Sequence, residues 1–328
     1  MPIRFRWFRP WAPCPLSARN GRCSGAPMRV CIGLGLASSL LAGCIPNTQY
    51  RYSAFTPAAR PIAWDGRTAR TGTLRVEGTL ASTYVNENVA PQIHDTALLV
   101  PSWTAEGAAM LAVSSRLEIG VRGAYSSYDW ASPSTVGTMP VPNAPPSWGV
   151  GPEIRVAIPL DDRKRFYLGI AGNTMNYQVP YAEWMLTGPG APTGNSPVAC
   201  TPSPTCVQGY SLHNTQNESH WTYSVVLQPS YAFGEKGEYG HAFVAITATT
   251  GFKNDGFTNQ PSNGSTVDTF WPLWIASVGY GALLEDLFSV SGSVFKPLTG
   301  PGSPVNYNLG FLLTVGVQAP IFEPIKGD

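Results

Sequence analysis

The chain has 328 residues, of which only 12% are charged, and its formal net charge at pH 7 is +1. This balance lacks the basic footprint of a nucleic-acid-binding protein, so no nucleic-acid partner is expected. The 34 glycines and 31 prolines favour one large β domain over two ordinary domains.

An apolar run, Val30–Ala42, follows the basic pair Met28-Arg29 near the N-terminus. Its length is typical of the apolar core of a secretion signal and too short to span a bilayer. We therefore interpret residues 1–43 as a leader and signal peptide that is removed on export, with Met28 as an alternative start.

The run closes on Leu41-Ala42-Gly43-Cys44, which resembles the lipobox of bacterial lipoproteins. The resemblance implies cleavage before Cys44, a diacylglycerol on its thiol and an acyl chain such as palmitate on its freed amine. Membrane lipid would then be a partner of the mature N-terminus. The alternative is a buried segment rich in leucine and glycine that ends in cysteine by chance.

Two ordinary cysteines remain after the leader is removed and Cys44 is assigned to lipid, namely Cys200 and Cys206. In an oxidising cell envelope this pair is expected to form a local disulfide. Its surroundings supply no histidine or second cysteine pair for zinc, so no metal or cofactor is expected.

Residues 44–72 contain prolines and arginines with little periodicity, and we interpret them as the lipidated N-terminus and a linker. From Thr73 onward, apolar residues alternate with small or polar ones, which is the period of a strand with two different faces. This alternation predicts ten strands: 73–85, 98–113, 116–127, 147–159, 165–179, 219–234, 240–253, 269–283, 287–298 and 305–319. The connections are short polar turns and longer loops, of which 180–218 is the largest.

This rhythm resembles bacterial outer-membrane β-barrels, in which short periplasmic turns alternate with longer external loops. The resemblance implies an antiparallel transmembrane barrel over residues 73–322, a C-terminal tail at 323–328 and a location in the outer membrane. An even strand count places both termini on the periplasmic side, although a surface-exposed lipid stays open. The alternative is a soluble β-barrel or sandwich with its apolar face inward.

Aromatic residues gather at the predicted strand ends, as the interfacial girdles of a membrane barrel do. Those near the long loops are Trp103, Trp130, Trp148, Trp184, Trp221, Trp271 and Trp274, and those near the short turns are Phe166, Tyr231, Phe233, Tyr280 and Phe288. Four prolines of the apolar set count against the membrane barrel, because proline cannot donate to a ladder, and bulges near the rims would accommodate only some of them. They are Pro101, Pro152, Pro229 and Pro272.

Charged residues of both signs stand on the polar face of successive strands. They are Arg75, Glu77, Glu106, Arg116, Glu118, Arg122, Glu153 and Arg155. In a membrane barrel this face lines the lumen, so the pattern predicts a lumenal network of ion pairs. The alternative is an ordinary solvated sheet face.

Ten strands enclose a narrow lumen, so we expect a plugged interior or at most a thin pore, and no general porin activity. The favoured function is non-enzymatic, structural or in surface interaction, with loop 180–218 as the surface for a partner. No catalytic residue is assigned, and the oligomeric state stays open.

Two other functions remain open. One is a lipid-tethered soluble β domain that binds a ligand or partner. The other is an outer-membrane hydrolase, which needs a nucleophile or activated water with a base. For that reading His94, Asp95 and His220 are the first candidates, although the chain contains no G-x-S-x-G motif.

Overall fold

The computed structural model describes residues 50–85, 97–127, 145–186, 206–207, 210–234, 239–254, 257–258, 267–284, 287–298 and 307–322. All of them belong to one unit of the chain, residues 46–328. No helix within these described ranges is long and apolar enough to cross a membrane.

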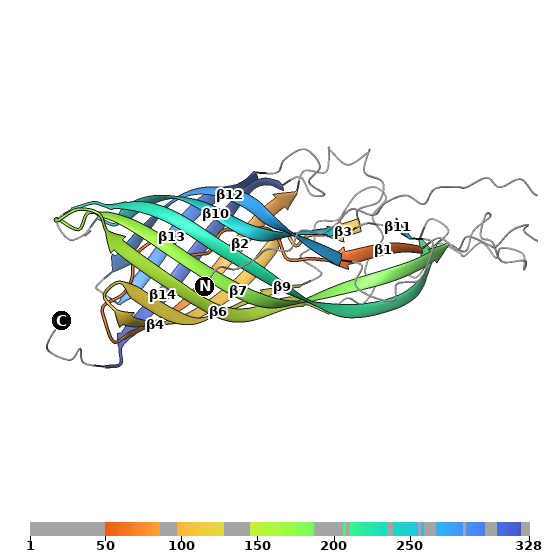
Figure 1. The fold of residues 1–328 in the computed structure, drawn as a ribbon, viewed down its shortest axis with the longest axis horizontal. Helices are drawn as coiled ribbons and strands as arrows, with labels where there is room; N and C mark the ends of the chain where they lie inside the picture. The colour runs from red at the N-terminus through yellow and green to blue at the C-terminus, as the bar shows by residue number, and fades with distance from the viewer. Residues whose placement is uncertain are drawn as a thin grey trace, which may run out of the picture. The chain divides into compact units, whose positions relative to one another are not determined.

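Ten antiparallel strands close into a barrel. They are β2 (Thr73–Val85), β4 (Trp103–Ser114), β5 (Leu117–Ser126), β6 (Ser147–Pro159), β7 (Phe166–Leu186), β9 (Tyr210–Ala232), β10 (His241–Asn254), β12 (Val267–Leu284), β13 (Phe288–Leu298) and β14 (Tyr307–Pro320). Each strand pairs with the next, and β14 pairs with β2 to close the sheet (Figure 1). The predicted all-β fold and the count of ten strands are confirmed.

The outer face of the barrel is apolar, whereas most residues of the inner face are polar or small. In β14, Phe311, Leu313 and Val315 are exposed on the outside, while Leu312 and Thr314 between them are buried. An aqueous solvent would disfavour such a continuous outer band, whereas lipid acyl chains stabilise it. The soluble barrel or sandwich is therefore the wrong alternative.

Exposed aromatic side chains lie at both ends of this band. Near the long connections they are Trp103, Trp148, Trp221, Trp271 and Trp274, and near the short turns they are Phe166, Phe233, Tyr280 and Phe288. Trp184 departs from the prediction, because its side chain is 0% exposed and packs inside the protein. Tyr231 is half-buried, and Trp130 lies outside the described residues.

Two predicted boundaries are wrong. The strand expected at 98–113 is divided, since β3 (Ala97–Leu99) ends before Pro101 and β4 begins at Trp103. The loop expected at 180–218 is much shorter, because β7 and β9 continue past the apolar band and stay paired to Leu186 and Tyr210. This two-stranded projection of β7 and β9, residues 178–186 and 210–219, is called the extension below (Figure 1). A short strand, β8 (Cys206–Val207), pairs with the first residues of β9.

Prolines interrupt the ladders where a backbone N–H is missing. The β6–β7 ladder has a gap beside Pro152, and the β9–β10 ladder has a gap beside Pro229. Pro272 lies at a register shift between β10 and β12. The barrel thus accommodates these prolines through local irregularities rather than by losing a strand.

The N-terminal part of the described chain corrects the linker assigned to residues 44–72. Strand β1 (Tyr50–Phe55) pairs with β7 of the extension, with β3 in parallel and with β11 (Phe257–Thr258), all on the long-loop side. Residues 56–72, called the lumenal segment, then pass through the barrel and reach β2 at the short-turn side. The two ends of the barrel, Thr73 and Pro320, pair on the short-turn side, as the even strand count predicts. Tyr50 lies on the long-loop side, because the lumenal segment crosses the barrel before β2.

Candidate functional site in the barrel lumen

The lumenal segment fills the interior of the barrel. Trp64 is only 3% exposed, and with Ile62 it packs on small wall residues such as Ala157 and Ala171. Ala58, Ala59 and Ala63 of the segment belong to a second apolar cluster, which contains Phe295 of the barrel wall. Small wall residues face a large side chain of the segment, so the two surfaces are complementary and leave little free space.

A network of buried ion pairs lines the wall beside this segment. Glu153 on β6 accepts hydrogen bonds from Arg122 on β5 and from Arg155, whose Nε lies 2.7 Å from Glu153 Oε1. Arg155 also binds both carboxylate oxygens of Glu77 on β2, at 3.0 and 2.6 Å. Arg122 Nη1 donates to Glu106 Oε2 on β4 at 2.7 Å. Bidentate and charge-assisted contacts of this kind fix the side chains as well as compensating their charges.

Arg75 extends the network toward the short-turn side. Its guanidinium lies 3.7 Å from Glu118, 3.5 Å from Glu77 and 3.4 Å from Asp65. Seven of the eight charged residues that the sequence analysis assigned to the lumen are thus buried there. Arg116 is the exception, because β4 and β5 are joined by a tight turn at 115–116 that leaves its side chain exposed to solvent.

The lumenal segment contributes two charges to the same network. Arg60 pairs with Glu106 and donates from Nη2 to the Tyr177 hydroxyl at 2.6 Å. Asp65 faces Arg75 from the segment and lies 3.8 Å from His241. The resulting cluster contains the arginines 60, 75, 122 and 155 and the carboxylates of residues 65, 77, 106, 118 and 153.

The wall also binds the backbone of the segment. Arg122 Nη2 donates to the Ala63 carbonyl oxygen at 2.9 Å, and Gln228 Nε2 donates to that of Trp64 at 3.0 Å. The Ala69 amide donates to Glu118 Oε1 at 2.6 Å. These contacts were missed from the sequence because a segment without periodicity carries no signal of burial.

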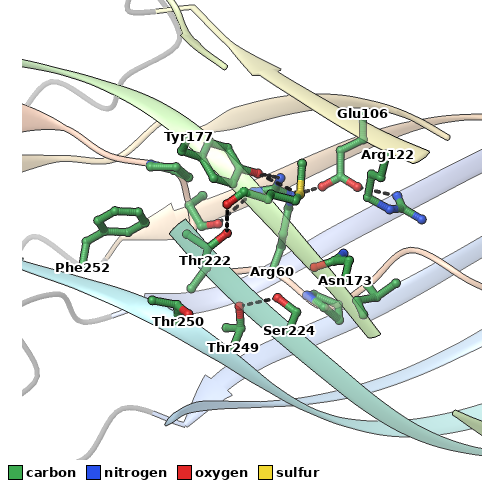
Figure 2. Close-up of a pocket in the computed structure, with 16 residues that line it drawn as sticks. Arg60, Glu106, Arg122, Asn173, Tyr177, Thr222, Ser224, Thr249, Thr250 and Phe252 are labelled. Atoms are coloured by element: carbon green, nitrogen blue, oxygen red, sulfur yellow. Dashed lines mark hydrogen bonds and ion pairs between the residues drawn. The ribbon is translucent and has the colours of Figure 1, made fainter. Parts of the chain in front are cut away.

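A cavity of about 40 Å³ remains between the segment and strands β7, β9 and β10. Figure 2 shows Arg60 and Tyr177 on one side of it and the hydrogen-bonded hydroxyls of Ser224 and Thr249, 2.7 Å apart, on the other. A polar space of this size holds a few water molecules at most. This cavity is therefore too small to serve as a path for solutes.

A second hollow, of about 420 Å³, opens on the long-loop side. It is lined by Glu218, Ser219, His220, Val267, Asp268 and Thr269. His220 Nε2 lies 3.1 Å from Glu218 Oε2, and the imidazole packs edge-on against Phe252. A histidine oriented by a carboxylate can act as a general base toward water.

Other predicted site residues lie where the structure gives no side-chain description. Leu41, Ala42, Gly43 and Cys44, together with His94, Asp95 and Cys200, are outside the described residues. Of Cys206 only the backbone is described, and it pairs with Ser211 in the extension. The lipid site and the disulfide therefore remain predictions.

No protein-family model and no curated protein sequence matches this chain. Among solved structures, the chain is similar to the outer membrane protease OmpT from Escherichia coli, with 9% identity and a TM-score of 0.32 over 83% of this chain and 95% of that chain. It is similar to the monoaromatic hydrocarbon channel CymD, with 8% identity and a TM-score of 0.29 over 77% and 90%. It is also similar to the toluene transporter TodX from Pseudomonas putida, with 9% identity and a TM-score of 0.25 over 87% and 91%.

The strand pairing and the apolar outer band of the chain itself determine its class. It is a transmembrane β-barrel of the bacterial outer-membrane type. Similarity at this level of identity transfers no activity, substrate or partner.

Proposed function

We propose that this protein is a lipid-anchored outer-membrane β-barrel that is closed by its own lumenal segment and has a non-enzymatic role in the cell envelope, structural or in surface interaction. The main support for this proposal is the set of buried ion pairs and backbone hydrogen bonds that join residues 56–72 to the barrel strands. A lumen that is filled by residues 56–72 is compatible with a scaffold and not with a general diffusion pore.

The surface role is assigned to the extension. Its β9 strand presents polar side chains to solvent, among them His213, Thr215, Asn217 and Ser219. Because β9 pairs with β7, and β7 pairs in turn with β1, this surface is part of a sheet rather than a loose loop. A preorganised surface loses less conformational entropy when a partner binds. The proposed Cys200–Cys206 disulfide would restrain the connection between the two strands further.

Planar-bilayer recordings test the closed lumen. We expect no open-channel current, or only small and rare steps, from the purified full-length protein. Sustained conductance of the size given by a general porin would contradict the proposal.

Lipidation is tested separately by metabolic labelling with an alkyne analogue of palmitate. Wild-type protein should carry the label, and Cys44→Ala should lose it while the barrel stays in the membrane fraction. Release of Cys44→Ala as soluble protein would mean that the acyl chains are the sole anchor.

A second candidate function is hydrolysis on the long-loop side, favoured by the His220–Glu218 pair at the open hollow. Fluorogenic peptides and p-nitrophenyl esters are suitable probes for the purified protein in detergent. Activity that is lost in both His220→Ala and Glu218→Gln but kept in His213→Ala would favour the hydrolase. Turnover that the first two variants do not change would exclude this pair.

A further inference from the structure

Strand β1, which leads into the lumenal segment, is held on the long-loop side, beyond the apolar band. Tyr50 pairs with Met185 near the tip of β7, and Ala54 pairs with Tyr181. The Thr56 amide then donates to the Leu99 carbonyl oxygen at 2.9 Å. Phe55 between them is fully buried, so the chain enters the lumen from a packed position on the long-loop side.

The other end of the segment is held at the short-turn side. The Gly72 amide donates to the Ala112 carbonyl oxygen at 2.8 Å, and the Ile321 amide donates to the Gly72 carbonyl oxygen at 2.9 Å. Gly72 has a φ of +79°, and a Cβ added there would lie 2.5 Å from the Phe322 carbonyl oxygen. This turn directs the chain into β2, so the path through the barrel runs from the long-loop side to the short-turn side.

Chain length then limits where Cys44 can lie. Cys44 precedes Tyr50 by six residues, which span at most about 20 Å when fully extended. On β7, Gln178 pairs with the girdle residue Trp148, and Met185 lies seven residues farther out, or about 23 Å along the strand. The apolar band adds about 25 Å to the depth of the inner leaflet.

We propose that the protein displays its N-terminus at the cell surface and that the acyl chains on Cys44 insert into the outer leaflet of the outer membrane. This inference rests on the proposed lipidation and adds the leaflet to it. Because the strands are tilted, the tip of β7 lies less than about 23 Å above the outer aromatic girdle, measured along the membrane normal. The six residues from Tyr50 back to Cys44 can therefore reach the outer girdle, but they cannot also cross the apolar band to the inner leaflet. The lipid would anchor the barrel from outside, next to the extension.

One consequence concerns assembly. One end of the lumenal segment is held on the long-loop side and the other on the short-turn side. During assembly, therefore, either the strands close around the segment or the segment is threaded through the closed barrel. The buried charges of Arg60 and Asp65 meet their partners only with the segment in place. The N-terminus therefore crosses the membrane as part of barrel assembly.

The test uses a site-specific protease added to intact cells. A recognition sequence is inserted after Asn47 in the full chain, and the cells are labelled with the palmitate analogue. We expect the protease to remove the lipid label from the barrel without permeabilisation. A matched control has the same sequence between Asp328 and a C-terminal tag, and this tag should be lost only after permeabilisation.

The outcomes separate this inference from the proposed lipidation. A labelled barrel that keeps its label in intact cells and loses it only after permeabilisation would overturn the outer-leaflet position while lipidation stands. A barrel that never acquires the label contradicts lipidation and, with it, the lipid position. If the Asn47 insertion prevents assembly, the sequence inserted after Pro46 gives the same readout.

Discussion

Glu153 on β6 is a buried carboxylate that pairs with two buried guanidinium groups, those of Arg122 and Arg155. The Glu153→Gln variant keeps the shape of the side chain but removes the negative charge between them. Breaking a buried ion pair on one side leaves an uncompensated charge, so the free energy of unfolding should fall by about 3–5 kcal/mol. Urea unfolding of the vesicle-inserted protein, followed by tryptophan fluorescence, measures this loss.

Arg116 provides the control for Glu153, because it was assigned to the same network from the sequence but is exposed in a turn. Arg116→Gln should change the free energy of unfolding by less than about 0.5 kcal/mol. Equal losses in the two variants would show that the buried network contributes no more than a surface charge.

Gly151 allows a prediction about the close approach of two strands. A Cβ at this position would lie 1.7 Å from the Thr174 carbonyl oxygen of β7, whereas a Cβ at Gly78 would meet nothing within 4 Å. Gly151→Ala should therefore separate β6 from β7 and destabilise the barrel by about 1–3 kcal/mol, and Gly78→Ala should be close to neutral. The same urea titration compares them, and similar stability in both variants would contradict the close approach.

Trp64 is the largest side chain that holds the lumenal segment in the barrel. Its ring centroid lies 5.8 Å from the Arg155 guanidinium carbon, and its indole N–H donates to the Arg67 carbonyl oxygen at 3.0 Å. Trp64→Ala should cost about 3–5 kcal/mol and loosen the segment in the lumen. The expected result is lower stability together with measurable ion conductance in planar bilayers.

Trp271, which is 50% exposed on the outer face, is the matched control for Trp64. Trp271→Ala removes the same side-chain volume without touching the lumen, so its conductance should equal that of the wild type. A destabilised Trp64→Ala barrel that stays non-conducting would mean that other contacts are sufficient to keep the segment in place.

The barrel strands were predictable because alternation is a local signal with one apolar and one polar face. The strand expected at 147–159 has the observed bounds of β6, and its inward charges Glu153 and Arg155 follow from the same alternation. The prediction of Arg116 failed because this residue lies in the turn at 115–116, directly before β5 begins at Leu117, where alternation no longer determines which way a side chain points.

The extension and the lumenal segment could not be predicted for a different reason. Residues 210–218 are nearly all polar, so their pairing with β7 depends on a partner strand and not on their own pattern. Residues 56–72 are buried only because the closed barrel surrounds them, and no local period marks this environment. Arg60 and Asp65 were therefore missed, although their partners Glu106 and Arg75 were assigned to the lumen.

At the scale of the whole molecule, the closed sheet should govern how the protein behaves in detergent. Every barrel strand is paired on both sides, so no edge is available from which unfolding can begin. The lumenal ion pairs add contacts that bridge β2, β4, β5 and β6 across the interior. Protein extracted in detergent should therefore stay folded in sodium dodecyl sulfate at room temperature and migrate faster than the boiled sample.

The outer band gives this prediction a second measurement. A variant can be made that lacks residues 1–43 and has Cys44→Ala as its first position. It keeps the apolar outer surface between the two aromatic girdles, so it should aggregate in buffer and become monodisperse only in detergent. Size-exclusion chromatography with and without detergent distinguishes the two states. A monomer that is stable in buffer alone, with no difference between boiled and unboiled mobility, would contradict a membrane-spanning barrel, because lipid would then not be needed to cover the outer face.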